Sequence, residues 1–193
     1  MVTYGVGLWL PQMVKALGHF STSQIGLIVA VPYVFAAIGM LISGYSSDRT
    51  GERKYHMSGA LIMSGIGLLG AACFSSNIVL TIIFLSITTV GIFAACPIFW
   101  MLPSSFLTGS AAAAGIALIN SIGNLGGFVG PLGMGWLKDV TGTFTTGLVV
   151  LAVGIIAAGI IGFGIWLRTE RIKAASTLLE LQRNNASTAG SVS

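Results

Sequence analysis

A charged segment at positions 44–56 constrains the fold of this chain more than any other feature. Its sequence is GYSSDRTGERKYH, it separates two long apolar runs, and Gly44 and Gly51 give it two flexible points. An unpaired charge in the hydrocarbon of a bilayer costs at least a few kcal/mol, so a charged segment between two membrane-length helices must lie in water. Because the segment contains Arg49, Arg53 and Lys54, we predict that it faces the cytoplasm.

Composition places the chain among membrane proteins. Of its 193 residues, 54% are hydrophobic and only 7% are charged, whereas a soluble protein carries about a quarter charged residues. Several apolar runs approach the roughly 20 residues that a spanning helix needs. We therefore predict an all-α, polytopic membrane helix bundle in the lipid bilayer. The net charge of +4 follows from the positive-inside rule, so we expect no nucleic-acid partner.

The apolar runs and the polar turns between them predict the helices. Five of the runs cover residues 2–17, 25–45, 57–74, 111–137 and 147–167. The fourth run in chain order begins at residue 78 and ends somewhere from 103 to 108. The first is short and contains Pro11, Gln12 and Lys15, so we expect it to be the outer end of a helix whose beginning is missing. Ser21 or Ser23 is predicted to cap the second helix. Residues 1–170 then form a six-helix bundle and residues 171–193 a cytoplasmic tail.

The positions of the basic residues predict the orientation. Seven of the nine Lys and Arg residues fall on the side of the charged segment, and only Lys15 and Lys138 fall on the other side. Basic residues are enriched in cytoplasmic loops. We therefore predict a multi-pass protein of the inner or plasma membrane with a cytoplasmic C-terminus.

Two asparagines in the fifth run are candidate site residues. Asn120 and Asn124 are four residues apart and so share one helical face. Buried amides in a membrane helix either join helices or line a polar cavity, and both interpretations stay open. Trp100 and Asn120 each lie ten residues from Ser110, so a turn there would place both about 15 Å deep. If the fourth helix ended at Pro103, Trp100 would instead be an ordinary interfacial residue.

The sequence contains no pattern typical of an enzyme. It has no Ser/His/Asp set, no phosphate-binding loop and no paired carboxylates within a span, and Cys73 and Cys96 lack the spacing of metal ligands. We expect neither catalysis nor a cofactor or metal. The spans also lack a central ionisable residue, which a proton relay or a carboxylate-binding site would need.

The charged segment resembles a family signature. The pattern GxxxDRxGxRK from Gly44 to Lys54 resembles the loop between the second and third helices of the major facilitator superfamily, which recurs between the eighth and ninth. WLP from Trp9, PIFW ending at Trp100 and INSIGNLGG from Ile119 resemble the anion:cation symporter branch of that family. The resemblance covers residues 1 to about 170 and implies half of a twelve-helix fold, helices seven to twelve, with seven missing its start.

The resemblance also implies a function. Members of this branch are secondary active transporters, so the chain would take part in proton-coupled symport of a small organic anion such as a sugar acid or an aromatic carboxylate. Its partners would be that anion, a proton and an N-terminal six-helix half, which carries most of the charged residues of the branch. Trp100 and Asn120 match positions that contact substrate in relatives, and Asn124 lies one turn further out.

The physics of the charged segment suggests a gate. Asp48 can accept hydrogen bonds from the amides at the N-terminus of a neighbouring helix, and Arg49 and Arg53 can pair with carboxylates there. The gating loop predicted in this way consists of Gly44, Asp48, Arg49, Gly51, Arg53 and Lys54. The alternative is that these residues only enforce topology. Glu52 departs from the family pattern, which often has a basic residue there.

Two other functions stay open from the sequence. The chain could be a self-sufficient six-helix channel or structural membrane protein that assembles as an oligomer, or a non-functional truncated fragment. Six further apolar spans upstream of Met1 would favour the transporter over the channel.

Overall fold

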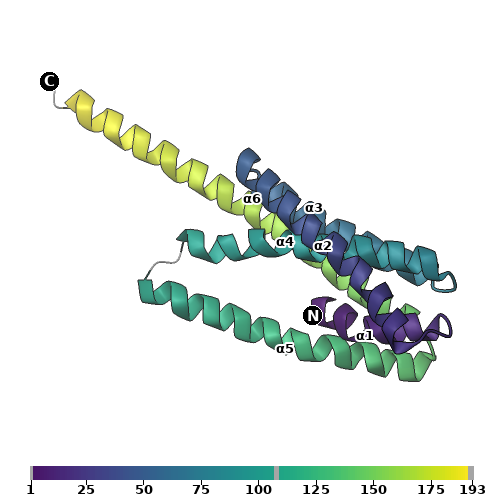
Figure 1. Ribbon diagram of the computed structural model, residues 1–193. Coiled ribbons are helices and arrows are strands. Elements are labelled where there is room, and N and C mark those ends of the chain that lie inside the picture. Colours follow the sequence, from purple (N-terminus) through teal and green to yellow (C-terminus); the bar gives the residue numbers. More distant parts are fainter. Residues whose placement is uncertain (1, 107–108, 191–193) are drawn as a thin grey trace.

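The chain forms a bundle of α-helices. The computed structural model describes residues 2–106 and 109–190, and these ranges contain no β-strand. The helices are α1 (Val2–Ala16), α2 (Thr22–Thr50), α3 (Arg53–Cys73), α4 (Ile78–Phe106), α5 (Gly109–Thr141) and α6 (Thr145–Gly190) (Figure 1). The all-α prediction is therefore confirmed.

Five of the described helices are long and apolar enough to cross a membrane. They are α2, α3, α4 over Ile78–Met101, α5, and α6 over Thr145–Arg171. The 15-residue α1 is not among them, in line with the prediction that the first segment is too short to span. The helix α6 continues beyond Arg171 to Gly190, so it includes most of the predicted tail, and the domain boundary at residue 170 stays a prediction.

The ends of α2 are set by local hydrogen bonds. At its start, Ser21 Oγ accepts from the Gln24 amide at 3.3 Å and Gln24 Oε1 accepts from the Ser21 amide at 2.9 Å, which is a capping box. Ser21 is thus the cap that the sequence left open between two serines. At its end, Gly51 adopts φ 71° and donates to Ser47 O, a conformation that suits glycine. The connection to α3 is short, and Gly44 lies inside α2, so the prediction of a flexible point at Gly44 is wrong.

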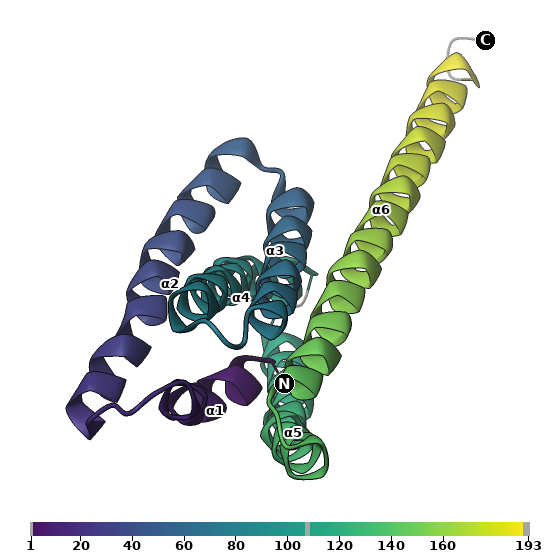
Figure 2. The same ribbon diagram turned by 90° about the vertical axis from the view of Figure 1, so that its right-hand side faces the viewer.

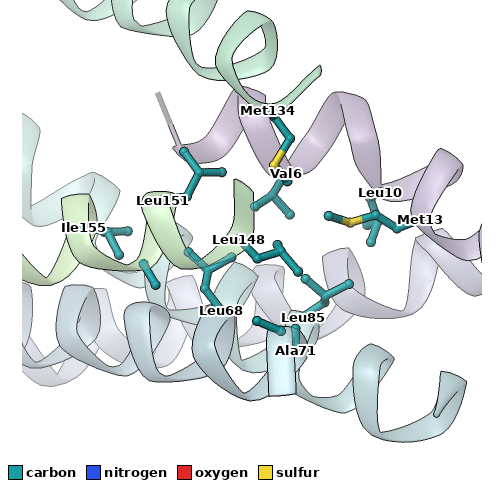
Figure 3. Close-up of a cluster of buried hydrophobic side chains, with 12 residues drawn as sticks. Val6, Leu10, Met13, Leu68, Ala71, Leu85, Met134, Leu148, Leu151 and Ile155 are labelled. Atoms are coloured by element: carbon teal, nitrogen blue, oxygen red, sulfur yellow. The ribbon is translucent and has the colours of Figure 1, made fainter. Parts of the chain in front are cut away.

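The helices form two groups. The helix α3 packs closely against α4 and α6, and α2 packs against α4, whereas α5 packs mainly against α1 and α6. Figure 2 shows α1 between α2 and α5. The main core lies where α1, α3, α4 and α6 meet, with Met134 added from α5, and its members include Leu10, Leu68, Leu85 and Leu148, each at most 2% exposed (Figure 3).

The crossing of α3 and α4 depends on small residues and hydroxyl groups. A Cβ atom at Gly67 would lie 2.6 Å from Thr88 Oγ1 and 2.7 Å from Phe84 O, so only glycine fits there without a shift. Thr88 Oγ1 also donates to Ser64 O at 3.3 Å. Because lipid tails are as apolar as side chains, such close approach and interhelical hydrogen bonding hold membrane helices together.

Candidate functional site

Trp100 lies near the C-terminal end of α4, which continues past Pro103 to Phe106. An end at Pro103 would have made Trp100 an ordinary interfacial residue, but the helix does not end there. The indole is half-buried, and its ring meets that of Phe99 edge-on, with the centroids 5.3 Å apart. The predicted turn at residues 108–110 lies partly outside the described residues, and α5 begins at Gly109 with φ 58°.

Asn120 and Asn124 are both exposed on α5. The helices α4 and α5 pack little against each other, and Figures 1 and 2 both show them apart over most of their lengths. The exposure of both amides argues against a role in joining helices within this chain. The assignment of Trp100, Asn120 and Asn124 to a substrate site stays a prediction.

The exposed part of the charged loop lies at the end of α2. The Asp48 side chain is 63% exposed, and its Oδ1 lies 3.9 Å from Arg53 Nη2, which is a long ion pair. Arg49 is exposed, and its Nη1 donates to Tyr45 Oη on the same helix at 3.5 Å. Exposed ion pairs are screened by water and salt and contribute little to stability. Asp48 and Arg49 are therefore accessible to other partners.

Lys54 lies in a different environment, although it belongs to the same motif. Its side chain is 17% exposed, and its Nζ pairs with Glu170 Oε2 on α6. The other oxygen, Glu170 Oε1, accepts from Trp166 Nε1 at 3.0 Å. The next residue, Tyr55, also contacts α6, where its ring lies 5.6 Å from the ring of Phe163. These contacts join the start of α3 to α6.

Sequence reasoning missed Glu170 and Trp166. The signal was weak but present, because Glu170 interrupts a basic run, with Arg168 and Arg171 on either side. A single carboxylate within a run of positive charges suggests that it has a specific partner. The sequence does not indicate that this partner is Lys54. A second link at this end is His56, whose Nε2 lies 2.9 Å from Ser46 Oγ and whose Nδ1 lies 3.0 Å from Glu52 O.

A large cavity lies between α3, α4 and α6. This α3–α4–α6 groove has a volume of about 1180 Å³, and Val2 and Thr3 of α1 line one part of it. Phe99 and Met101 line it from α4, whereas Trp100 is not among its lining residues. Almost all of its lining residues are apolar, and its polar residues include Arg53, Thr169 and Glu170. Among the described residues, no group of His, Cys, Asp and Glu could hold a metal ion.

Long apolar helices joined by short connections, with charge concentrated at one connection, define a polytopic α-helical membrane protein. The family model described as "Major Facilitator Superfamily" matches residues 1–190. The chain belongs to this superfamily, as its loop motif predicted.

Three relatives show which members of the superfamily this chain is similar to. Two proteins named "Putative tartrate transporter" from Agrobacterium vitis are 49% identical over 149 residues and 44% identical over 158 residues. These matches cover 77% and 82% of this chain but 33% and 36% of the relatives. A "Quinolone resistance transporter" from Acinetobacter baumannii is 38% identical over 177 residues, which cover 92% of this chain and 41% of that protein. The chain therefore spans about a third to two-fifths of the length of these relatives.

Proposed function

We propose that this chain forms one six-helix half of a secondary transporter that carries a small organic anion together with a proton. The observation that supports this most is the 49% identity to a protein named as a tartrate transporter, over 77% of the chain. Transporters of this superfamily bind substrate near the bilayer midplane between two halves and rock around that site. The chain would supply one wall of the site, and an N-terminal six-helix half would supply the other.

In this proposal Asn120, Asn124 and Trp100 face the other half. The two exposed amides support this, because an amide without a hydrogen-bond partner in lipid costs several kcal/mol. Facing a polar cavity, the amides would hydrogen-bond the hydroxyl and carboxylate oxygens of a substrate such as a sugar acid. Trp100 would pack against its apolar part. An amide carries no net charge, so the cations that neutralise the anion would come from the N-terminal half.

The exposed end of α2 would act as the gate. Asp48 would cap the N-terminus of a helix in the other half, where the helix dipole favours negative charge, and Arg49 would pair with a carboxylate there. The exposure of both side chains supports this assignment. Lys54 would take no part in the gate, because Glu170 of α6 already holds it. The short connection between α2 and α3 and the C-terminus would both be cytoplasmic, in the inner or plasma membrane.

The test is uptake into liposomes by the chain assembled with an N-terminal six-helix half from a tartrate-transporter relative. We expect tartrate uptake that requires an inward proton gradient and that Asn120→Ala reduces about tenfold or more. Leu118→Ala is the control, because Leu118 is exposed on the opposite side of α5 and should leave uptake unchanged. Uptake that ignores the proton gradient, or that responds equally to both variants, would contradict the proposal.

The similarity to a quinolone resistance transporter favours a second substrate class. The same liposomes should therefore be tested for competition by a quinolone. Competition that disappears in Trp100→Ala while tartrate uptake persists would indicate that aromatic compounds use the Trp100 part of the site. Quinolone transport without any tartrate transport would replace the organic anion in the proposal by a drug-like aromatic substrate.

A further inference from the structure

The helix α5 is anchored near its C-terminal end. Its buried residues are Gly130 and Met134, whereas residues 109–129 are all exposed or half-buried. The helix packs mainly against α1 and α6 and little against α4, and Figures 1 and 2 show its first part apart from α4. Residues 109–129, which include Asn120 and Asn124, therefore extend away from an anchor that lies around Gly130 and Met134.

Pro131 interrupts the backbone hydrogen bonds of α5 at this anchor. Proline has no backbone N–H, so the carbonyl of Gly127, four residues earlier, loses its usual helical donor. Helices bend most readily where their hydrogen-bond ladder is interrupted in this way. Contacts from outside the helix must therefore set the direction in which residues 109–129 extend.

Two aromatic side chains of α1 supply such contacts on either side of Pro131. Trp9 Nε1 donates a hydrogen bond to Pro131 O at 2.9 Å. A Cβ atom at Gly135 would lie 2.8 Å from Trp9 Cζ2, and a Cβ atom at Gly127 would lie 2.9 Å from Tyr4 Cδ2. Each ring thus occupies the space that a glycine leaves open. The two glycines lie one helical turn before and one turn after Pro131.

The orientation of the Trp9 ring is fixed by further contacts. The centroid of its ring lies 5.6 Å from that of Phe144, which precedes α6. Lys138 Nζ lies 5.7 Å from the centroid of the Trp9 ring and 5.2 Å from that of the Phe144 ring, within the range of a cation–π attraction. Because the ring is held on several sides, its N–H keeps pointing at the Pro131 carbonyl.

A small tilt of α5 at Pro131 has a large effect at Asn120. Asn120 lies 11 residues before Pro131, which corresponds to about 16 Å along a helix. At that distance, a tilt of about 4° moves the residue by about 1 Å. An N–H···O hydrogen bond of about 2.9 Å that is stretched by about 1 Å is no longer a hydrogen bond. The group that fixes α5 at Pro131 therefore controls whether the amide reaches a ligand.

We propose that Trp9 is a positioning residue that sets the direction of α5 through its hydrogen bond to the Pro131 carbonyl and so holds Asn120 and Asn124 at the substrate site. The part that concerns the substrate site rests on the proposed function, whereas the control of α5 does not.

The first test measures the position of α5 in the purified chain without substrate. Spin labels are placed on Cys73, which is exposed at the end of α3, and on α5 through Leu118→Cys, in a chain that carries Cys96→Ser. Trp9→Phe removes the donor, and 3-benzothienylalanine at position 9, in which sulfur replaces the N–H, removes it while keeping the ring. We expect each change to broaden the distribution of distances between the labels by about 2 Å or more, since a tilt of a few degrees already moves residue 118 by more than about 1 Å. Trp136→Phe is the matched control, because Trp136 is 64% exposed on the same helix, and it should leave the distribution unchanged.

The second test measures tartrate uptake by the chain assembled with an N-terminal six-helix half. Both changes at Trp9 should raise the KM about tenfold, because the amides lose a hydrogen bond to the bound substrate, and should leave the maximal rate per folded molecule nearly unchanged. Trp136→Phe should leave the KM unchanged. A merely structural role of Trp9 predicts instead a lower Tm with an unchanged KM.

The outcomes separate this inference from the proposed function. An unchanged distance distribution in both Trp9 proteins overturns the control of α5, and a broadened distribution with an unchanged KM overturns the role at the substrate site. If the assembled parent transporter takes up no tartrate, the proposed function fails, and the distance distribution alone then supports or overturns the control of α5 by Trp9.

Discussion

Replacement of Gly67 by Ala tests whether the close crossing of α3 and α4 holds this bundle together. The new Cβ would lie 2.7 Å from Phe84 O, about 0.7 Å inside the shortest ordinary van der Waals contact, so α4 has to move away from α3. A gap of about 0.5–1 Å forfeits about a quarter to a half of the dispersion energy of the contacts that it opens. The Thr88 to Ser64 hydrogen bond at 3.3 Å, worth about 0.6 kcal/mol in a membrane protein, is also weakened. We expect a cost of about 1–3 kcal/mol, the usual range for overpacking.

Gly59→Ala is the matched control, since Gly59 lies on the same helix and a Cβ there meets no atom within 4 Å. Both substitutions gain the same helix propensity, up to about 1 kcal/mol, so their difference isolates the crossing. The measurement is thermal unfolding of the purified chain in detergent, where 1 kcal/mol corresponds to about 2–4 °C in Tm. Equal Tm values for the two variants would refute the idea that backbone proximity at Gly67 stabilises the fold.

Three further predictions concern topology, the ion pair and activity. A reporter fused after Ser193 and another inserted at Thr50 should both report cytoplasm, and a signal from the opposite side for either would overturn the orientation. Lys54→Glu and Glu170→Lys should each lower the Tm, and the double variant should recover most of the loss; without recovery, the two side chains do not interact in the protein. The chain by itself should show no proton-driven anion uptake in liposomes, because its spans lack a central ionisable residue, and such uptake would contradict the half-transporter proposal.

Local patterns predicted the helices well because their signals lie within a few residues of each other. The sequence Ser21-x-x-Gln24 encodes a capping box, and α2 begins there. Gly51 supplies the left-handed residue that ends α2. The prediction for Gly44 failed because a glycine alone does not end a helix. Gly44 lies six residues before the end of α2, and a helix accommodates a single glycine without ending, at a cost of about 1 kcal/mol.

Contacts between distant residues were less accessible from the sequence. Counting from Ser110 gives the depth of Trp100 and Asn120 along their helices, but it does not give the lateral distance between α4 and α5. These helices diverge, since α5 packs mainly against α1 and α6. Likewise, Lys54 and Glu170 are 116 residues apart, and no periodicity relates them. The groove was also invisible, because it depends on which faces of three helices converge.

In the proposed function, the charged loop divides between two tasks, a gate and a contact within the bundle. A gate needs contacts that form in one conformation and break in the other at low cost, which suits exposed charges because water and salt screen them. Asp48 and Arg49 meet this condition at the exposed end of α2. Lys54 does not, because its ion pair with Glu170, supported by Trp166, joins α3 to α6 within one bundle. If the bundle moves as a rigid body, that contact stays closed throughout. Substitutions at Arg49 should then alter transport without changing the Tm, and substitutions at Lys54 should lower the Tm first.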